Sequence, residues 1–208
     1  MEPILRRSPV VFEEKPVITE DKNGFKVVCE YAGEGDGPWL IDLSHNKRWD
    51  IQDKQISDMK PFGLSVPGVP GNISMENGFI VNRLNKTQAA VIHVKGDAPE
   101  KTAETMITET TDATVFLALV GNGIFNITEK LSIMDFIDKD KTPPFLIQGP
   151  FSHVPCQLMV IERNGNGGVL LLTCSRGYAH DMVEALLHAG KEFGLKPAGE
   201  NAFMAKLG

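Results

Sequence analysis

The chain has 208 residues, of which 42% are hydrophobic, 23% charged and 7% aromatic. This composition is that of an ordinary globular protein and excludes disordered, collagen-like and coiled-coil sequences. The 21 Lys and Arg residues stand against 27 Asp and Glu residues, which gives a net charge of −6, and no stretch concentrates the basic ones. We therefore expect no nucleic-acid partner, because such binding rests on a basic surface.

The cysteines and the N-terminus indicate the compartment. Cys29, Cys156 and Cys174 are odd in number, far apart in sequence and embedded in apolar runs, as expected of buried, unreactive thiols in a reducing compartment. The N-terminus lacks the uninterrupted apolar stretch of a signal peptide, and no apolar run is long enough to span a membrane. We therefore expect a cytoplasmic protein without a membrane partner.

The chain divides into an arm and a folded part. Residues 1–24 contain three prolines, a charge cluster and little periodicity, which predicts an N-terminal arm laid over the surface or onto a partner. Residues 25–208 predict a single domain made of two half-units of similar content, at about 25–110 and 111–208. We find no internal sequence repeat that relates the two halves.

The first half-unit begins with strand-like patterns. Residues 25–31 predict a strand, and a second apolar run follows at 39–43. Residues 52–59 have weak helical character. Residues 61–71 contain three prolines and three glycines and predict a loop.

A hairpin and a helix are expected to complete this half. The runs 78–84 and 89–94, joined by a polar turn, predict the hairpin. Asp97 stands where a helix N-cap would be, with Pro99 in the first turn, so a helix of about three turns is expected to follow. Its apolar face would consist of Ala103, Met106 and Ile107.

The pattern then restarts in the second half-unit. Residues 113–120 form a continuous apolar run, and apolar residues on one helical face follow over 124–134. A second hairpin is predicted at 156–162 and 169–173, and an amphipathic helix at 179–190. Strands and helices mixed in this order predict an α+β fold made of two related half-units.

No residue set predicts catalysis. Ser44 and His45 are adjacent on an extended segment, so their side chains point to opposite faces and cannot form a nucleophile and base pair; a strand-end capping role is expected instead. The histidine spacings predict no metal site. The glycine-rich segments 121–123 and 165–168 lack the nucleotide-binding fingerprints and are expected to be turns.

Four short motifs follow one another between about Gly24 and about Phe203. They are a strand end with Asp-Leu-Ser-His, a central hairpin, an apolar strand and a C-terminal Gly-Leu-Lys-Pro-Ala-Gly segment, at Trp39–His45, Glu76–Val94, Asp112–Gly121 and Glu184–Gly199. These motifs and their order resemble the glycine-cleavage T protein (aminomethyltransferase) superfamily. The resemblance implies a T-protein-like, folate-binding type of fold.

Two departures concern the folate ligands. Family transferases carry Asp-Asp after the central glycines, whereas here Gly78 runs directly into apolar residues. The family's Arg-Thr-Gly-Tyr-Thr-Gly-Glu segment corresponds to residues 163–168, where only the Arg and the glycines remain. The resemblance therefore implies weakened folate affinity, because a neutral hairpin cannot accept the hydrogen bonds that a pterin donates. Tetrahydrofolate is the one cofactor that the sequence leaves possible for this chain.

In length and in these missing ligands the chain is most similar to the gamma subunit of heterotetrameric sarcosine oxidase. It stops shortly after Gly199, where the family's catalytic members continue into a further domain. This resemblance implies a non-catalytic subunit, packed against a larger subunit that binds flavin and folate, in the oxidative demethylation of an N-methyl amino acid.

Two alternatives remain from the sequence. One is a stand-alone folate-dependent aminomethyl- or methyltransferase that uses a relocated acid, Glu76 or Glu162. The other is a binding protein for a different small ligand between the halves, with Arg83 and Arg163 as anion contacts. The candidate binding residues are therefore Arg83, Arg163, Glu76 and Glu162.

Overall fold

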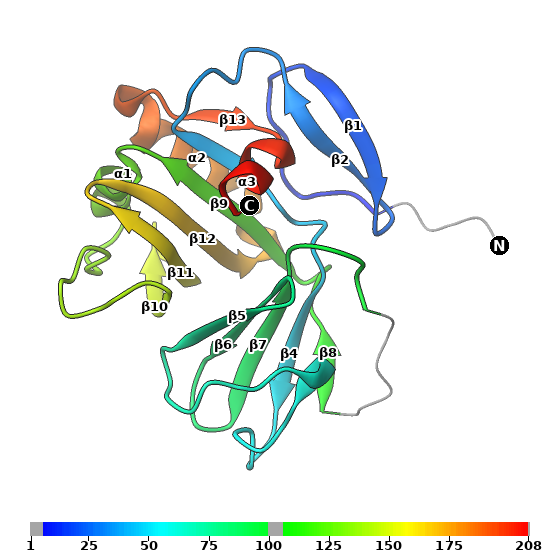
Figure 1. Ribbon diagram of the computed structural model, residues 1–208. Coiled ribbons are helices and arrows are strands. Elements are labelled where there is room, and N and C mark those ends of the chain that lie inside the picture. The colour runs from blue at the N-terminus through cyan, green and yellow to red at the C-terminus, as the bar shows by residue number, and fades with distance from the viewer. Residues whose placement is uncertain (1–5, 100–105, 208) are drawn as a thin grey trace.

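The computed structural model describes residues 6–99 and 106–207 and confirms an α+β fold with several sheets (Figure 1). The α-helices of the described residues are α1 (Ile124–Leu131), α2 (Ala179–Gly190) and α3 (Glu200–Leu207). The strands are β1 (Pro16–Lys22), β2 (Phe25–Tyr31), β3 (Trp39–Asp42), β4 (Arg48–Gln52), β5 (Ile73–Glu76), β6 (Phe79–Arg83), β7 (Gln88–His93), β8 (Ile107–Glu109), β9 (Thr114–Gly121), β10 (Phe145–Phe151), β11 (Val154–Asn164), β12 (Gly167–Ser175) and β13 (Lys196–Ala198).

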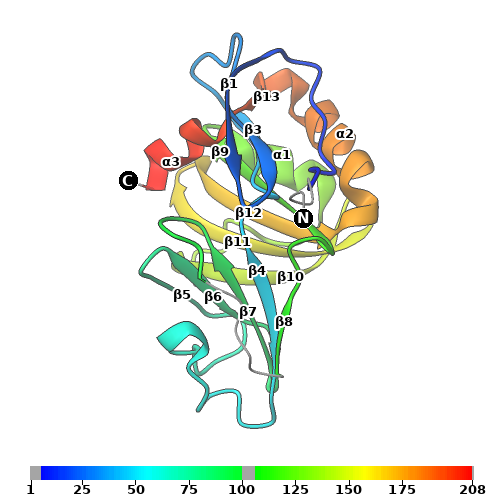
Figure 2. The ribbon, with the colours of Figure 1, turned by 90° about the vertical axis from the view of Figure 1, so that its right-hand side faces the viewer.

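A six-stranded sheet forms the centre of the molecule, in the order β10-β11-β12-β9-β3-β13. Its central strands β9 and β12 are apolar on both faces, because both faces are covered. Helices α1 and α2 pack on one face, and α3 lies on the other (Figure 2). The amphipathic pattern at 179–190 is thereby confirmed as α2. The helical face predicted over 124–134 is confirmed as α1 as far as Leu131, but Ser132 is extended and Met134 lies beyond the helix.

A five-stranded sheet, in the order β5-β6-β7-β4-β8, packs against the α3 side of the first sheet. Alternate residues of β6 and β7 face that interface, among them Ile80 and Ile92. The residues between them, such as Val81 and Val91, pack under the loop that joins β4 to β5. The predicted hairpin is confirmed as β6 and β7, paired in antiparallel register from Phe79 with His93.

The segment expected to be an arm contains a strand. Strand β1 pairs with β2 in a two-stranded antiparallel sheet of its own. Most side chains of β1 are exposed, so the strand is held by its backbone ladder with β2, and its sequence carries no burial pattern that could have indicated it.

The sheets do not follow the sequence halves. Strand β3 lies within 25–110, yet it pairs with β9 in the six-stranded sheet. Strand β13, from the end of the chain, pairs with β3 in parallel. The chain therefore leaves the six-stranded sheet after β3, builds the five-stranded sheet and returns at β9.

Two helix predictions in the first half need correction. Residues 52–59 are not a helix: the segment leaves β4 and forms turns, in which Asp53 Oδ1 accepts a hydrogen bond from the Gln55 N–H. The helix expected after Asp97 is also not supported, because 97–99 are not helical and Ile107 lies in β8, paired with Ile51. The rest of that prediction falls on residues 100–105, outside the described residues.

Candidate functional site

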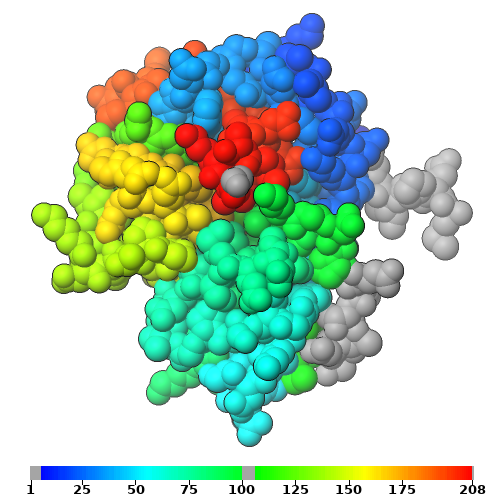
Figure 3. Space-filling model, viewed as in Figure 1, coloured from blue at the N-terminus to red at the C-terminus, as the bar shows by residue number. Residues whose placement is uncertain are grey.

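A cavity of about 350 Å³ lies where four segments meet, at the junction of the two large sheets and the β1–β2 hairpin. In Figure 3, α3 in red lies at the surface between the blue hairpin and the green part of the five-stranded sheet. A cavity of this size can hold a small organic molecule. Its lining consists of Lys22, Asn23, His45, Asn46, His93, Val94, Lys95, Gly96, Asp97, Ala98, Glu200 and Met204.

The turn after β3 positions two of the lining residues. Asp42 Oδ1 accepts a hydrogen bond of 2.9 Å from the Ser44 N–H, which tightens the turn. Ser44 Oγ accepts one of 3.2 Å from the Phe116 N–H, which confirms the strand-end role expected of Ser44. Asn23 Nδ2 donates to the His45 carbonyl at 3.1 Å. His45 and Asn46 are thereby held between the hairpin and α3.

Glu200 is the centre of a buried ionic cluster. Its Oε1 lies 2.9 Å from His45 Nε2, and its Oε2 accepts a hydrogen bond of 2.6 Å from Lys22 Nζ. The side chains of His45 and Glu200 are only 4% and 6% exposed. Burial alone would raise the pKa of Glu200, but the hydrogen bonds and charges of His45 and Lys22 lower that pKa to about 2. Glu200 is therefore ionised at neutral pH.

Lys22 shares the cluster with a second carboxylate. Its Nζ lies 3.0 Å from Glu20 Oε2, on its own strand. Burial opposes the charged form of Lys22, but the hydrogen bonds to Glu200 and Glu20 raise its pKa above the usual value. The ion pair thus fastens the exposed β1–β2 hairpin to α3.

Gly199 allows α3 to begin this close to the hairpin. A methyl group at Gly199 would overlap the backbone of Cys29 in β2. The Gly199 N–H donates at 2.7 Å to Glu34 Oε1, which also accepts a 2.6 Å hydrogen bond from the Tyr31 N–H. The close approach therefore requires glycine, and it sets the position of Glu200 next along the chain.

We expect Gly199→Ala to lower the free energy of unfolding by about 2 kcal/mol, since backbone cannot yield to a new methyl group as a flexible side chain can. Chemical denaturation followed by circular dichroism measures the loss. Gly177→Ala is the matched control, because a methyl group there meets no atom within 4 Å. Equal stability of Gly199→Ala and the unchanged chain would contradict the close approach.

Asn46 supplies an unused donor at the cavity. Its side chain is buried, with 6% exposure, and its Nδ2 has no hydrogen-bond partner among the described residues. A buried amide N–H without a hydrogen-bond partner destabilises the folded chain. We therefore expect an acceptor group of a ligand, or a water molecule, to accept a hydrogen bond from Asn46 Nδ2. His93 lies at the same cavity, and burial together with the charge of Lys47 lowers its pKa.

The cavity has the features of a binding site. The residues that line it include no serine, threonine or cysteine nucleophile within the described ranges, and Glu200 is already committed to two partners. A carboxylate that stays ionised at neutral pH and is already hydrogen-bonded to two side chains is a poor general acid or base. The arrangement can hold a small molecule through hydrogen bonds to Asn46, Lys95 and Asp97, while Val94 and Met204 supply apolar contact.

The two candidate arginines do not line this cavity, and they differ in their partners. Arg83, at the end of β6, is buried at 4% exposure, and its Nη2 donates to the Lys86 carbonyl at 2.8 Å. Its Nε and Nη1 have no partner among residues 6–99 and 106–207. Arg163 is half-buried and donates to three backbone carbonyls, those of Phe136, Asp138 and Lys141, at 2.7 to 3.3 Å.

The two candidate carboxylates are exposed. Glu76 ends β5 and contacts the side chain of its neighbour Asn77, while Glu162 lies on β11 and contacts Asn164. Within the described ranges, no hydrogen bond or ion pair joins any two of the four candidate residues, and none of the four lines the cavity beside Glu200. Their joint role in ligand binding stays a prediction.

The residues that do converge, Lys22, Asn46 and Glu200, were not singled out from the sequence. Lys22 lies in the segment expected to be an arm, and Asn46 follows the Ser44-His45 pair. One signal was present for Glu200, since it directly follows the Pro-Ala-Gly segment that carried the strongest part of the resemblance.

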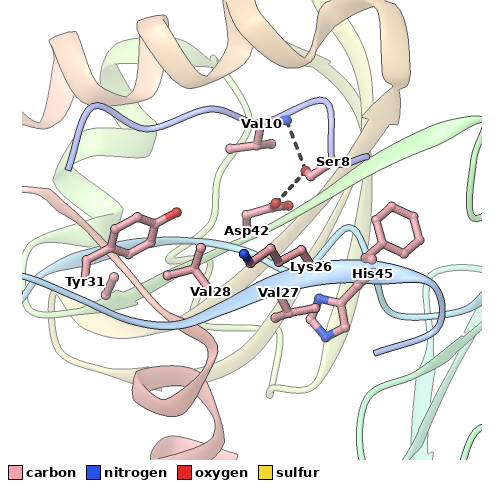
Figure 4. Close-up of a pocket in the computed structure, with 10 residues that line it drawn as sticks. Ser8, Val10, Lys26, Val27, Val28, Tyr31, Asp42 and His45 are labelled. Carbon is pink, nitrogen blue, oxygen red and sulfur yellow. Dashed lines mark hydrogen bonds between the residues drawn. The ribbon is translucent and has the colours of Figure 1, made fainter. Parts of the chain in front are cut away.

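A second, smaller cavity of about 70 Å³ lies between the N-terminal segment and β2 (Figure 4). Ser8 Oγ donates to Asp42 Oδ2 at 2.5 Å and accepts from the Val10 N–H at 3.1 Å. Burial raises the pKa of Tyr31 on its wall. These contacts fix the N-terminal segment over β2 and β3, and the space they leave is too small for more than a few atoms.

The described residues contain neither a membrane-spanning helix nor a cluster of metal ligands. No helix there combines the length and the apolarity needed to cross a membrane. No group of three or more His, Cys, Asp or Glu residues is placed to hold a metal ion in residues 6–99 and 106–207.

Comparison with known proteins finds a similar fold among the solved structures. No protein-family model and no curated protein matches the sequence. Among solved structures, a chain of the heterotetrameric sarcosine oxidase from Corynebacterium sp. U-96, solved in complex with pyrrole 2-carboxylate, superposes with a TM-score of 0.59 at 13% sequence identity. The match covers 74% of this chain and 84% of that one. The present chain therefore has the fold of a chain of heterotetrameric sarcosine oxidase.

Proposed function

We propose that this chain is a non-catalytic, T-protein-like subunit of an assembly that demethylates N-methyl amino acids oxidatively. The observation that carries the proposal is its likeness in fold to one chain of a heterotetrameric enzyme, over most of both chains. In this proposal a larger subunit binds the flavin and folate. The buried, free cysteines support a cytoplasmic location for the assembly.

The positions of the candidate ligands support a non-catalytic role. A pterin needs a desolvated carboxylate that accepts its paired hydrogen bonds. Glu76 and Glu162 are exposed, and the guanidinium of Arg163 is occupied by backbone carbonyls. Neither carboxylate has the surroundings of a buried acid or base.

Affinity purification of the tagged full chain from its native cells tests the proposal. We expect a stoichiometric complex with a larger polypeptide that shows flavin absorbance and oxidises an N-methyl amino acid. An unrelated tagged protein of the same size, purified from the same extract, controls for adventitious capture. A chain that elutes alone, or with partners that carry no flavin, would contradict the proposal.

The alternative is a stand-alone folate-dependent transferase, favoured by the cavity beside Glu200 and its unused Asn46 donor. Titration with tetrahydrofolate in a thermal-shift experiment separates the two functions. A ligand at a hundredfold its dissociation constant stabilises by about 2.7 kcal/mol, or roughly 5–10 °C for a chain of this size. We expect no shift.

A clear shift with tetrahydrofolate would instead favour the transferase. Its location would then follow from two variants. Loss of the shift in Asn46→Leu would place the folate in the cavity, and loss in the Glu76→Gln, Glu162→Gln double variant would place it at the acids predicted from the sequence.

A further inference from the structure

Two cysteines that are 18 positions apart in sequence lie side by side on adjacent strands of the six-stranded sheet. Strands β11 and β12 are antiparallel, with Gln157 opposite Thr173, so the next step of the register places Cys156 opposite Cys174. Both side chains lie on the face covered by α1 and α2, and both are buried, at 6% and 4% exposure. The register and the shared face make the two thiols direct neighbours.

The strand geometry suits a disulfide. Directly opposed residues of an antiparallel pair have Cβ atoms about 4.5–5.5 Å apart. A disulfide needs about 3.5–4.5 Å between Cβ atoms, with Cα atoms within about 6.8 Å. A small local shift of the two strands toward each other therefore brings the sulfurs within bonding distance. Cys29, on β2, is buried in a different part of the fold and has no such neighbour among the described residues.

The two thiols are not equivalent. Cys156 hydrogen-bonds to the sulfur of Cys174, which lowers the pKa of Cys174 against the opposing effect of burial. The same hydrogen bond, together with burial, raises the pKa of Cys156. Cys174 is thus the better nucleophile of the pair, and Cys156 is placed to resolve a product formed on it.

We propose that Cys156 and Cys174 are an oxidation site, at which a small peroxide converts the two thiols to an intramolecular disulfide. The Cys174 sulfur attacks hydrogen peroxide, whose O–O bond breaks to give a sulfenic acid and one water molecule. The Cys156 sulfur then attacks the sulfenic sulfur, the S–O bond breaks, and a second water molecule leaves as the S–S bond forms. Both sulfurs are oxidised and both peroxide oxygens are reduced.

The disulfide would fasten β11 to β12 at the end where β12 leads to α2. The cross-link closes a loop of the β11–β12 hairpin, which restricts the unfolded chain and stabilises the folded sheet. The site depends neither on a partner subunit nor on folate, so it can be tested whether or not the proposed function holds.

Thiol counting and peptide mapping after treatment of the folded full chain with hydrogen peroxide test the site. We expect the free thiols to fall from three to one, the intact mass to fall by two hydrogen atoms, and a Cys156–Cys174 peptide to appear. The midpoint of thermal unfolding should rise by roughly 5–10 °C and return on reduction.

Three variants control the experiment. Cys29→Ala should still lose its two remaining thiols, while Cys156→Ala and Cys174→Ala should form no intramolecular disulfide. Near-ultraviolet circular dichroism shows that each variant folds. The urea-unfolded chain, treated with the same peroxide, shows that the reagent can oxidise the thiols. If the folded chain kept all three thiols under that treatment, the proposal would be overturned. A cross-link that involves Cys29 would overturn it too.

Discussion

Replacing Arg48 with alanine should lower the free energy of unfolding by about 4 kcal/mol, the largest effect that we expect from a single substitution. Arg48 is 3% exposed, and its guanidinium donates five hydrogen bonds. Four go to backbone carbonyls and one to a side-chain hydroxyl. The acceptors are the carbonyl oxygens of Ser44 (3.2 Å), Asn46 (2.6 Å), Thr111 (2.7 Å) and Thr114 (2.9 Å), and Thr114 Oγ1 (2.9 Å).

The expected loss has two physical causes. Truncation leaves buried carbonyls without a donor, and it leaves a cavity where the long side chain was. The cationic form itself carries a burial cost, because burial lowers the pKa of Arg48 to about 10. Its hydrogen bonds outweigh this cost, and they join the turn that carries His45 and Asn46 to the segment that leads into β9.

Urea unfolding of the full chain measures the change. Arg48→Lys keeps the positive charge but not the forked set of N–H donors. We therefore expect it to lower the free energy of unfolding by about half as much as Arg48→Ala does. Arg163→Ala is the matched control, since Arg163 also binds backbone carbonyls but is half-buried at the surface; a loss of about 1 kcal/mol is expected there. A loss below that of Arg163→Ala would show that Arg48 does not hold the turn.

The sequence alone was sufficient to predict an element whose own apolar and polar residues show which of its faces is buried. The alternation over 25–31, the apolar run of β9 and the amphipathic stripe of α2 each determine which face is buried, and all three elements form where expected. Strand β10, which pairs with the next strand β11, gave no such signal, because Gly149 and Pro150 interrupt its apolar pattern. The proline is tolerated because β10 is an edge strand, where proline costs no ladder hydrogen bond.

The cavity could not be assembled from sequence for a related reason. Lys22 and Glu200 are 178 positions apart, and each has the charge of an ordinary surface residue. Only the parallel pairing of β13 with β3, and the contact of Gly199 with β2, place the start of α3 beside the turn after β3. Arg83 and Arg163, by contrast, were proposed together as anion contacts, and the fold gives them separate surroundings.

Glu200→Gln should lower the free energy of unfolding by about 3 kcal/mol at pH 7, and the difference should disappear in acid. The folded chain holds the pKa of Glu200 at about 2, against an ordinary value of 4.5. A carboxyl group with a lowered folded pKa stabilises the protein fully above its unfolded pKa, and the stabilisation is lost as the pH falls from about 5 to about 2. Unfolding curves at pH 7, 5, 4 and 3 measure the decline.

The exposed pair His180–Glu184 provides the matched control for Glu200. Its Nε2 and Oε1 atoms lie 3.5 Å apart, but the side chains are 79% and 69% exposed, so Glu184→Gln should change stability by less than about 0.5 kcal/mol at any of these pH values. If Glu200→Gln behaved like Glu184→Gln, the buried cluster would contribute nothing to the attachment of α3. A destabilisation that persisted undiminished at low pH would mean that Glu200 acts through packing and not through its charge. The expected result, a loss that fades with protonation, would identify the Lys22–Glu200–His45 cluster as the electrostatic contact that keeps the β1–β2 hairpin, the turn after β3 and α3 together around the cavity.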